Sequence, residues 1–153
     1  EYFDIDGDRL NQNRTWFSGG SGVLASGSLP ASAALRAAWM VSIAGAVALA
    51  LAAVQVPPVL LPGITAFGAA WSYSGPPLRL SRTGWGELTA SLVVAMLVPV
   101  VGFMMQSGGA IRPEILLMAA PLVLIHFAML IAFQVPDRQA DIAAGKLTLL
   151  ARL

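Results

Sequence analysis

The sequence predicts an all-α protein, a polytopic bundle of transmembrane helices. Of its 153 residues, 57% are hydrophobic and only 11% are charged, whereas soluble domains carry about 25% charged residues. The mean hydropathy is +0.74. Four apolar stretches are long enough to cross about 30 Å of hydrocarbon, and they lie at about 31–56, 58–74, 87–105 and 114–135.

The first predicted span begins after Pro30 and runs through Ala-, Val- and Leu-rich sequence. It should end at Val56, because Pro57 and Pro58 cannot continue a helix. A very short turn therefore connects it to the second span.

The second predicted span, 58–74, contains Pro62 and Gly63. A membrane helix tolerates such residues because neighbouring helices re-satisfy the freed backbone groups. We expect a kink near Pro62.

A polar segment at 74–87 follows, rich in Gly, Pro and Ser and carrying Arg79 and Arg82, and its composition indicates a structured loop. The third span, 87–105, should end at the polar residues around Ser107. The fourth span, 114–135, should end before Pro136.

The charged residues separate by membrane face if all four stretches cross. Residues 1–30, 74–86 and 136–153 then share one face. Counting Arg36 and Glu87, which lie near the adjoining ends of their spans, this face holds every basic residue except Arg112 and every acidic residue except Glu114. Because basic residues concentrate on the cytoplasmic side, that face should be cytoplasmic. Almost all groups capable of chemistry lie there.

Two acidic pairs on this face share one spacing: Asp4 with Asp8, and Asp137 with Asp141. On a helical turn, residues four apart project from the same side. Like charges this close repel, so the arrangement favours a bound cation, and oxygen-only ligands indicate Mg²⁺, with Mn²⁺ as the alternative. A single pair of this kind is usually just a solvated loop, but two pairs on one membrane face are harder to explain in that way.

A calcium loop is an alternative for the first acidic pair, since Asp4, Asp6 and Asp8 match the first three ligands of an EF-hand. Arg9 stands where that loop needs its Gly, and Thr15 stands where it needs a bidentate Glu. The calcium interpretation therefore fails at two positions.

Basic residues on the same face could bind phosphate oxygens, or could simply set topology and contact lipid headgroups. They are Arg79, Arg82, Arg138, Lys146 and Arg152. His126 lies inside the fourth span with no His or carboxylate three or four residues away, so we expect it to pack and not to catalyse.

Three segments together resemble the UbiA-type membrane prenyltransferases. The two acidic pairs resemble the family's Asn-x-x-x-Asp-x-x-x-Asp and Asp-x-x-x-Asp motifs, although the motif Asn would fall one position before Glu1. The segment from Tyr73 to Glu87 is similar to the family's Tyr-Ser-x-Pro-Pro loop with its following Gly-x-Gly-Glu. Residues 144–149 are similar to its Ala-Gly-Lys-x-Thr-Leu.

Within the family, the resemblance is greatest to the 1,4-dihydroxy-2-naphthoate polyprenyltransferases of menaquinone synthesis. It is carried by Pro136 before the second acidic motif, by the Ala-Gly-Lys-x-Thr segment, and by residues 14–21 after the first motif. The family fold has nine transmembrane helices. Residues 1–153 would be a partial domain of this fold, truncated at both ends and holding about the third to the sixth helix. We expect such a fragment to be inactive alone.

The resemblance implies transfer of a polyprenyl group from its diphosphate to an aromatic acceptor, on the cytoplasmic side of the cell inner membrane. It implies Mg²⁺ ligation by Asp4, Asp8, Asp137 and Asp141, diphosphate binding by Lys146 and Arg79, and secondary contributions from Arg14, Tyr73 and Asn11. The expected partners are the two substrates and the lipid bilayer, with no nucleic acid.

Two rival functions remain open. A sibling transferase would use 4-hydroxybenzoate, a chlorophyll precursor or a glycerol-phosphate lipid as acceptor. A transporter or channel would place acidic residues in mid-membrane, whereas here they lie at the ends of the spans, which argues against it.

Overall fold

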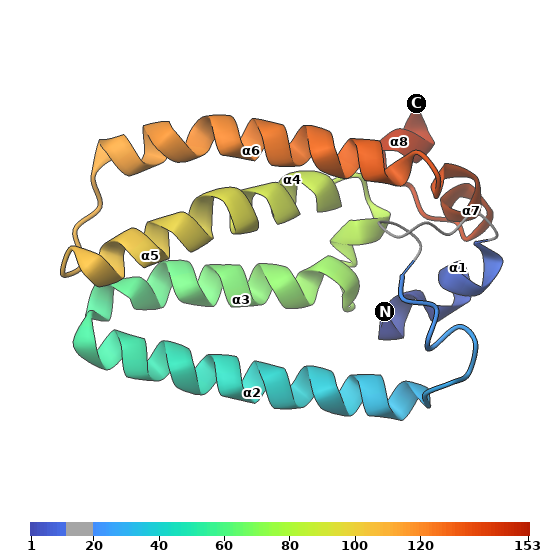
Figure 1. Cartoon of the computed structure of the whole chain (residues 1–153), viewed down its shortest axis with the longest axis horizontal. Helices are drawn as coiled ribbons and strands as arrows, with labels where there is room; N and C mark the ends of the chain where they lie inside the picture. Colours follow the sequence, from blue (N-terminus) through green and yellow to red (C-terminus); the bar gives the residue numbers. More distant parts are fainter. Residues whose placement is uncertain (12–19) are drawn as a thin grey trace.

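The computed structural model describes residues 1–11 and 20–153, and all regular structure in those residues is helical. Four long helical rods lie side by side, and short helices gather at one end, where both termini also lie (Figure 1). The elements are η1 (Tyr2–Asp4), α1 (Ile5–Leu10), α2 (Ala31–Gln55), η2 (Pro57–Val59), α3 (Leu60–Ser74), η3 (Leu80–Arg82), α4 (Gly86–Leu92), η4 (Val93–Leu97), α5 (Val98–Gln106), α6 (Pro113–Gln134), α7 (Arg138–Ala143) and α8 (Leu149–Arg152).

The predicted all-α polytopic fold is confirmed. Among the described residues, three helices are long and apolar enough to cross a membrane: Ala31–Gln55, Gly86–Gln106 and Pro113–Gln134. The second predicted span is represented by α3, whose 15 residues rise about 22 Å at 1.5 Å per residue. The 3₁₀ turn η2 precedes α3 and extends the same rod.

Pro62, near which the sequence suggested a kink, is at the start of α3. It lies in the first turn of the helix, where backbone N–H groups have no intrahelical acceptor in any case. A proline there removes no hydrogen bond, whereas Pro121 lies inside α6.

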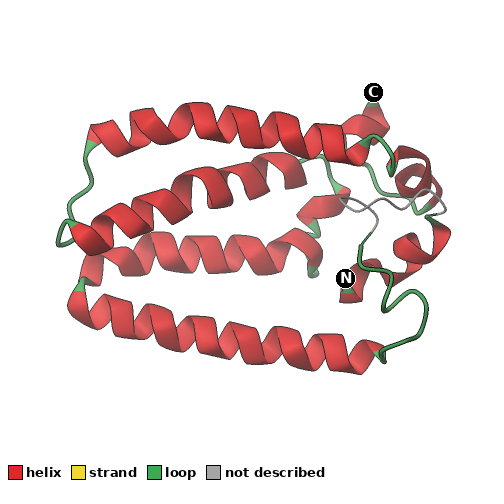
Figure 2. Cartoon of the chain, in the orientation of Figure 1, coloured by secondary structure: helices red, strands yellow, loops and turns green. Residues whose placement is uncertain are grey.

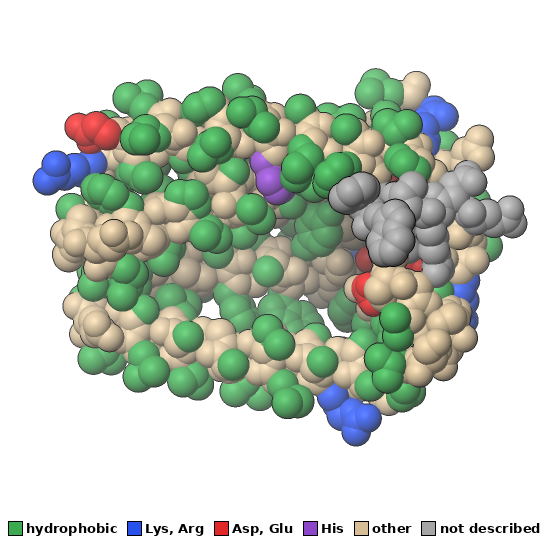
Figure 3. Space-filling view, viewed as in Figure 1, with side chains coloured by type: hydrophobic (Ala, Val, Ile, Leu, Met, Phe, Trp, Pro, Cys, Tyr) green, Lys and Arg blue, Asp and Glu red, His purple; other side chains and the backbone are tan. Residues whose placement is uncertain are grey.

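Few residues of the bundle are buried, and most of its exposed surface is apolar. α2 has no buried residue at all, and Val54 on it is 81% exposed. Hydrophobic side chains cover the middle of the molecule and charged ones lie toward its ends (Figure 3). An apolar surface of this extent fits hydrocarbon as the surrounding solvent.

A small core lies at the end of the bundle opposite the termini. Val56 and Val59 of the α2–α3 connection pack there against Val100 and Met104 of α5. Gly109 makes this packing possible, since it adopts φ +93° and a Cβ there would come within 3.0 Å of Pro58.

Helices α4 and α5 form one continuous rod through the π-helical turn η4. Pro99 follows this turn and cannot donate to the carbonyl of Ala95 four residues earlier. A π-turn re-registers the backbone hydrogen bonds at such a point.

The loops divide between the two ends of the rods (Figure 2). Residues 1–11, 74–86 and 135–153 are at one end, together with α1, α7 and α8, and the connections at 56–59 and 107–112 are at the other. This is the division that the parity of four crossings predicts.

Candidate active site

Helices α1 and α7 each begin at an aspartate and carry a second aspartate one turn later. Asp4 is the N-cap residue of α1 and Asp137 that of α7, with Asp8 and Asp141 in the following turn. The two helices pack against each other at the end of the bundle. As a result the four carboxylates, far apart in the sequence, line one cavity of about 240 Å³.

The chain after α7 turns back through a Schellman motif, which places Lys146. Gly145 adopts φ +67°, its N–H donates to the Ile142 carbonyl at 3.1 Å, and the Lys146 N–H donates to the Asp141 carbonyl at 2.8 Å. These are the two hydrogen bonds of that motif, and glycine favours the left-handed position. The Ala-Gly-Lys sequence therefore returns the lysine to the acidic residue five positions earlier.

Lys146 lies between the two acidic pairs. Its Nζ is 3.2 Å from Asp4 Oδ1 and 3.6 Å from Asp141 Oδ1, and its side chain is only 14% exposed. Gly7 of α1 leaves room for it, since a Cβ at that position would lie 3.3 Å from Lys146 Cε. Burial raises the pKa of Asp141, while the Lys146 charge lowers it and Asp137 and Asp4 raise it further.

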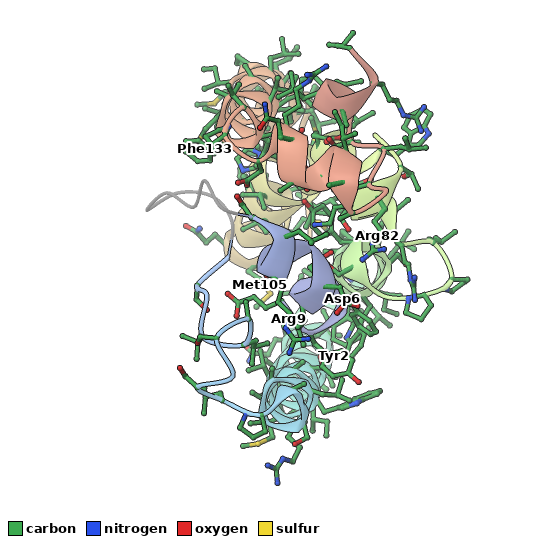
Figure 4. The ribbon with its side chains drawn as sticks, turned by 90° about the vertical axis from the view of Figure 1, so that its right-hand side faces the viewer. Tyr2, Asp6, Arg9, Arg82, Met105 and Phe133 are labelled. Carbon is green, nitrogen blue, oxygen red and sulfur yellow. The ribbon has the colours of Figure 1, made fainter. Side chains whose placement is uncertain are left out.

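Of the two arginines in the 74–87 loop, the structure brings Arg82 to the acidic residues. Its guanidinium lies 3.8 Å from Asp4 Oδ1 and donates to the Phe3 carbonyl at 3.1 Å. Arg79 is exposed, and neither arginine lines the cavity itself. Figure 4 shows Arg82 beside α1, while Asp6 and Arg9 are paired on the outer side of that helix.

Asn11, Tyr73 and Arg14 were also expected near the site. Asn11 is buried and its amide donates to Asp137 Oδ1 at 2.7 Å, so it links the end of α1 to the start of α7. Tyr73, at the end of α3, lines the same cavity. Arg14 lies outside the described residues.

Several cavity residues were missed from the sequence. Ser81 and Gln134 line the cavity, and each carries a buried side-chain oxygen that has no hydrogen-bond partner among the described residues. Thr148 lines it too and caps α8 through its hydroxyl. These are uncharged residues in loops or at helix ends, where no sequence pattern indicates which way a side chain points.

His126 packs as expected. Its Nδ1 lies 3.1 Å from the Ser91 hydroxyl, which joins α6 to α4 inside the bundle, and it does not line the cavity. We therefore assign it no chemical role.

The residues around the cavity suit a divalent cation that arrives with a phosphate ligand. Within residues 1–11 and 20–153, no group of three or more Asp, Glu or His side chains stands close enough to hold a metal alone. Mg²⁺ commonly takes only one or two carboxylates and completes its shell with water and substrate phosphate. Asp4 Oδ1, buried without a hydrogen-bond partner and facing Lys146, is an oxygen of the right kind.

In a comparison with known protein families, residues 1–153 match the family described as the UbiA prenyltransferase family. Comparisons with curated proteins and with solved structures give no match. The matched range includes both acidic pairs and the Ala-Gly-Lys turn that the fold brings together.

Proposed function

The chain belongs to the UbiA prenyltransferase family, and from this premise we propose that it transfers a polyprenyl group from prenyl diphosphate to an aromatic acceptor in a Mg²⁺-dependent reaction. We propose 1,4-dihydroxy-2-naphthoate as the acceptor, in menaquinone biosynthesis. The active end would face the cytoplasm from the inner membrane.

One observation carries the proposal. Four aspartates from opposite ends of the chain and one lysine line a single cavity at the end of an apolar bundle. Carboxylates that would repel one another surround a cation position, and Lys146 now pairs with two of them. A diphosphate accompanied by Mg²⁺ matches this alternation of charge, and an isoprenoid tail matches the surrounding apolar helices.

In this proposal Asp4 and Asp8 hold metal on one side of the cavity, and Asp137 and Asp141 hold it on the other. When bound, Mg²⁺ would stabilise the negative charge that develops on the diphosphate. Asn11 restrains Asp137 through their 2.7 Å hydrogen bond, so that this carboxylate keeps its orientation.

Lys146 and Arg82 would donate charge-assisted hydrogen bonds to phosphate oxygens. The allylic C–O bond of the donor breaks, the electron pair leaves with the diphosphate, and the allylic carbon forms a C–C bond with the aromatic ring. The ring then regains aromaticity by losing the group at that carbon, which is a proton to water or, at the carboxyl-bearing carbon of the naphthoate, CO₂. The two cations stabilise the leaving group in this step. Tyr73, at the end of α3, lines the cavity, and we propose it with Arg79 and Arg14 as a further contact of the diphosphate.

The choice of acceptor rests on the resemblance of residues 14–21, 136–141 and 144–148 to the naphthoate enzymes. The alternatives are 4-hydroxybenzoate, a chlorophyll precursor and a glycerol-phosphate lipid.

The test is an assay of membranes containing the full-length protein, supplied with labelled prenyl diphosphate, Mg²⁺ and each acceptor in turn. We expect a labelled, lipid-soluble prenylated product from 1,4-dihydroxy-2-naphthoate, and chelation of divalent cations should abolish its formation. Labelling of another acceptor alone would reject the naphthoate assignment, and labelling of none would reject the proposed transfer. Membranes that contain the Asp141→Asn variant are the matched control.

A further inference from the structure

Glu87 is a buried acidic residue that the cavity chemistry does not use. It lies in the first turn of α4, is 2% exposed, and does not line the cavity. A carboxyl group buried this deeply requires hydrogen-bond partners, because burying a polar group without them costs free energy. Its partners are therefore informative about what it does.

One oxygen of Glu87 holds two other elements. Oε1 accepts from the Gln134 amide at the end of α6 at 2.6 Å, and from the Leu149 N–H at the start of α8 at 3.3 Å. Oε2 has no hydrogen-bond partner among the described residues. The two hydrogen bonds of this carboxyl group therefore connect α4 to α6 and to α8.

Leu149 belongs to a segment, 146–152, that lies along the 79–87 loop. The Leu147 N–H donates to the Arg82 carbonyl at 3.0 Å, and the Arg152 guanidinium donates to the Thr83 carbonyl at 3.1 Å. Lys146 begins this segment and Arg82 lies in that loop, and both side chains approach Asp4. The two cations of the site are therefore carried by two segments that are joined to each other, and Glu87 joins them to the bundle.

We infer that Glu87 is a positioning residue, which anchors segment 146–152 to α4 and α6 so that Lys146 and Arg82 are held over Asp4. Its consequence for catalysis rests on the proposed function, since it requires that these cations bind the diphosphate. The anchoring itself does not depend on that function.

Anchoring is tested by limited trypsin digestion of the detergent-solubilised protein, with cleavage after Lys146 identified by mass spectrometry. In the native protein this bond is protected, because Lys146 is ion-paired and its neighbour Leu147 is hydrogen-bonded to the loop. Glu87→Leu removes both acceptor bonds, so we expect cleavage after Lys146 to be faster by about tenfold or more. Glu87→Gln keeps an oxygen that can accept both bonds, and we expect it to restore protection.

The matched control is Ser91→Ala, one turn deeper on α4. The Ser91 hydroxyl contacts His126 of α6 and donates to the Glu87 backbone carbonyl at 2.7 Å, and among the described residues neither of these hydrogen bonds reaches segment 146–152. If Ser91→Ala exposes Lys146 as much as Glu87→Leu does, or if Glu87→Leu leaves it protected, the inference is wrong. Should Glu87→Leu fail to fold, Gln134→Leu removes one of the two bonds and must give a smaller acceleration.

Kinetics separate this inference from the proposed function. Displaced cations should raise the KM for prenyl diphosphate in Glu87→Leu about tenfold or more while kcat falls less, and Glu87→Gln should recover the native KM. If Glu87→Leu exposes Lys146 to trypsin but leaves the KM unchanged, the anchoring by Glu87 is supported and the role of these cations in diphosphate binding is rejected.

Discussion

Asp137 and Asp141 face the cavity from the same short helix, and each is already engaged by a neighbour, Asn11 or Lys146. We predict that Asp137→Asn or Asp141→Asn lowers Mg²⁺-dependent transfer by about 100-fold or more, because a neutral amide loses several kcal/mol of metal-borne charge stabilisation. The measurement is initial rate against Mg²⁺ concentration. Asp6→Asn is the control, because the Asp6 side chain is 97% exposed on the outer side of α1. Unchanged Mg²⁺ dependence in both cavity variants would refute the metal assignment.

Lys146 is expected to act on binding more than on turnover. A charge-assisted hydrogen bond contributes about 1.5–3 kcal/mol, and each 1.4 kcal/mol is about tenfold, so Lys146→Ala should raise the KM for prenyl diphosphate about 10- to 100-fold. Saturation kinetics with varied donor would measure it. Arg9→Ala removes an exposed cation of the same face and should leave KM unchanged. A loss confined to kcat would instead place Lys146 in the chemical step alone.

At the residue scale, the sequence indicates which residue types contribute to the site, but it does not always identify which of two neighbouring residues of the same type does so. Lys146 was recognised because its motif is compact, and the Schellman turn explains why that motif works. Arg79 was expected at the diphosphate and Arg82 was not, because no sequence pattern separates two arginines three positions apart in an irregular loop. Arg79 adopts φ +46° and is exposed, whereas the Arg82 guanidinium lies 3.8 Å from Asp4 Oδ1.

At the scale of elements, the turn after α7 should be sensitive to a single methyl group. Gly145→Ala places a Cβ on a residue at φ +67°, which costs about 1 kcal/mol and should lower the thermal unfolding midpoint in detergent. Gly145→Asn should be milder, because Asn tolerates the left-handed region. Gly45→Ala is the control: that position is inside α2 with open space around it, so the substitution should not destabilise. Equal midpoints for Gly145→Ala and Gly45→Ala would contradict this account of the turn.

The boundaries of the long helices could be predicted to within a residue or two, because prolines and polar turns end them. α2 stops at Gln55, before Pro57, and α6 stops at Gln134, before Pro136. The π-turn in the third rod and the 3₁₀ start of the second could not be predicted, since hydropathy does not distinguish hydrogen-bond registers. The contact between α1 and α7 was likewise invisible, because it joins segments more than a hundred residues apart.

At the scale of the whole molecule, charge and architecture agree on one end of the bundle. The end with α1, α7 and α8 holds the cavity and the basic side chains of Lys146 and Arg82. The opposite end holds Arg112 and Glu114 as its charged residues. The position of the cavity and the clustering of charge at that end do not by themselves tell which side of the membrane the end faces. The excess of Lys and Arg does so through the positive-inside rule, which is the basis for proposing a cytoplasmic active end.

That orientation can be measured directly, because the chain has no cysteine and each introduced thiol is therefore unique. Ala110 and Ser28 are both exposed, in connections at opposite ends of the bundle. In intact spheroplasts a membrane-impermeant maleimide should label Ala110→Cys, and should label Ser28→Cys only after permeabilisation, since the basic end is held inside. The reverse pattern would put the aspartate cavity outside the cell, away from cytoplasmic prenyl diphosphate. Labelling of both thiols in intact cells would mean that the bundle does not hold a single orientation.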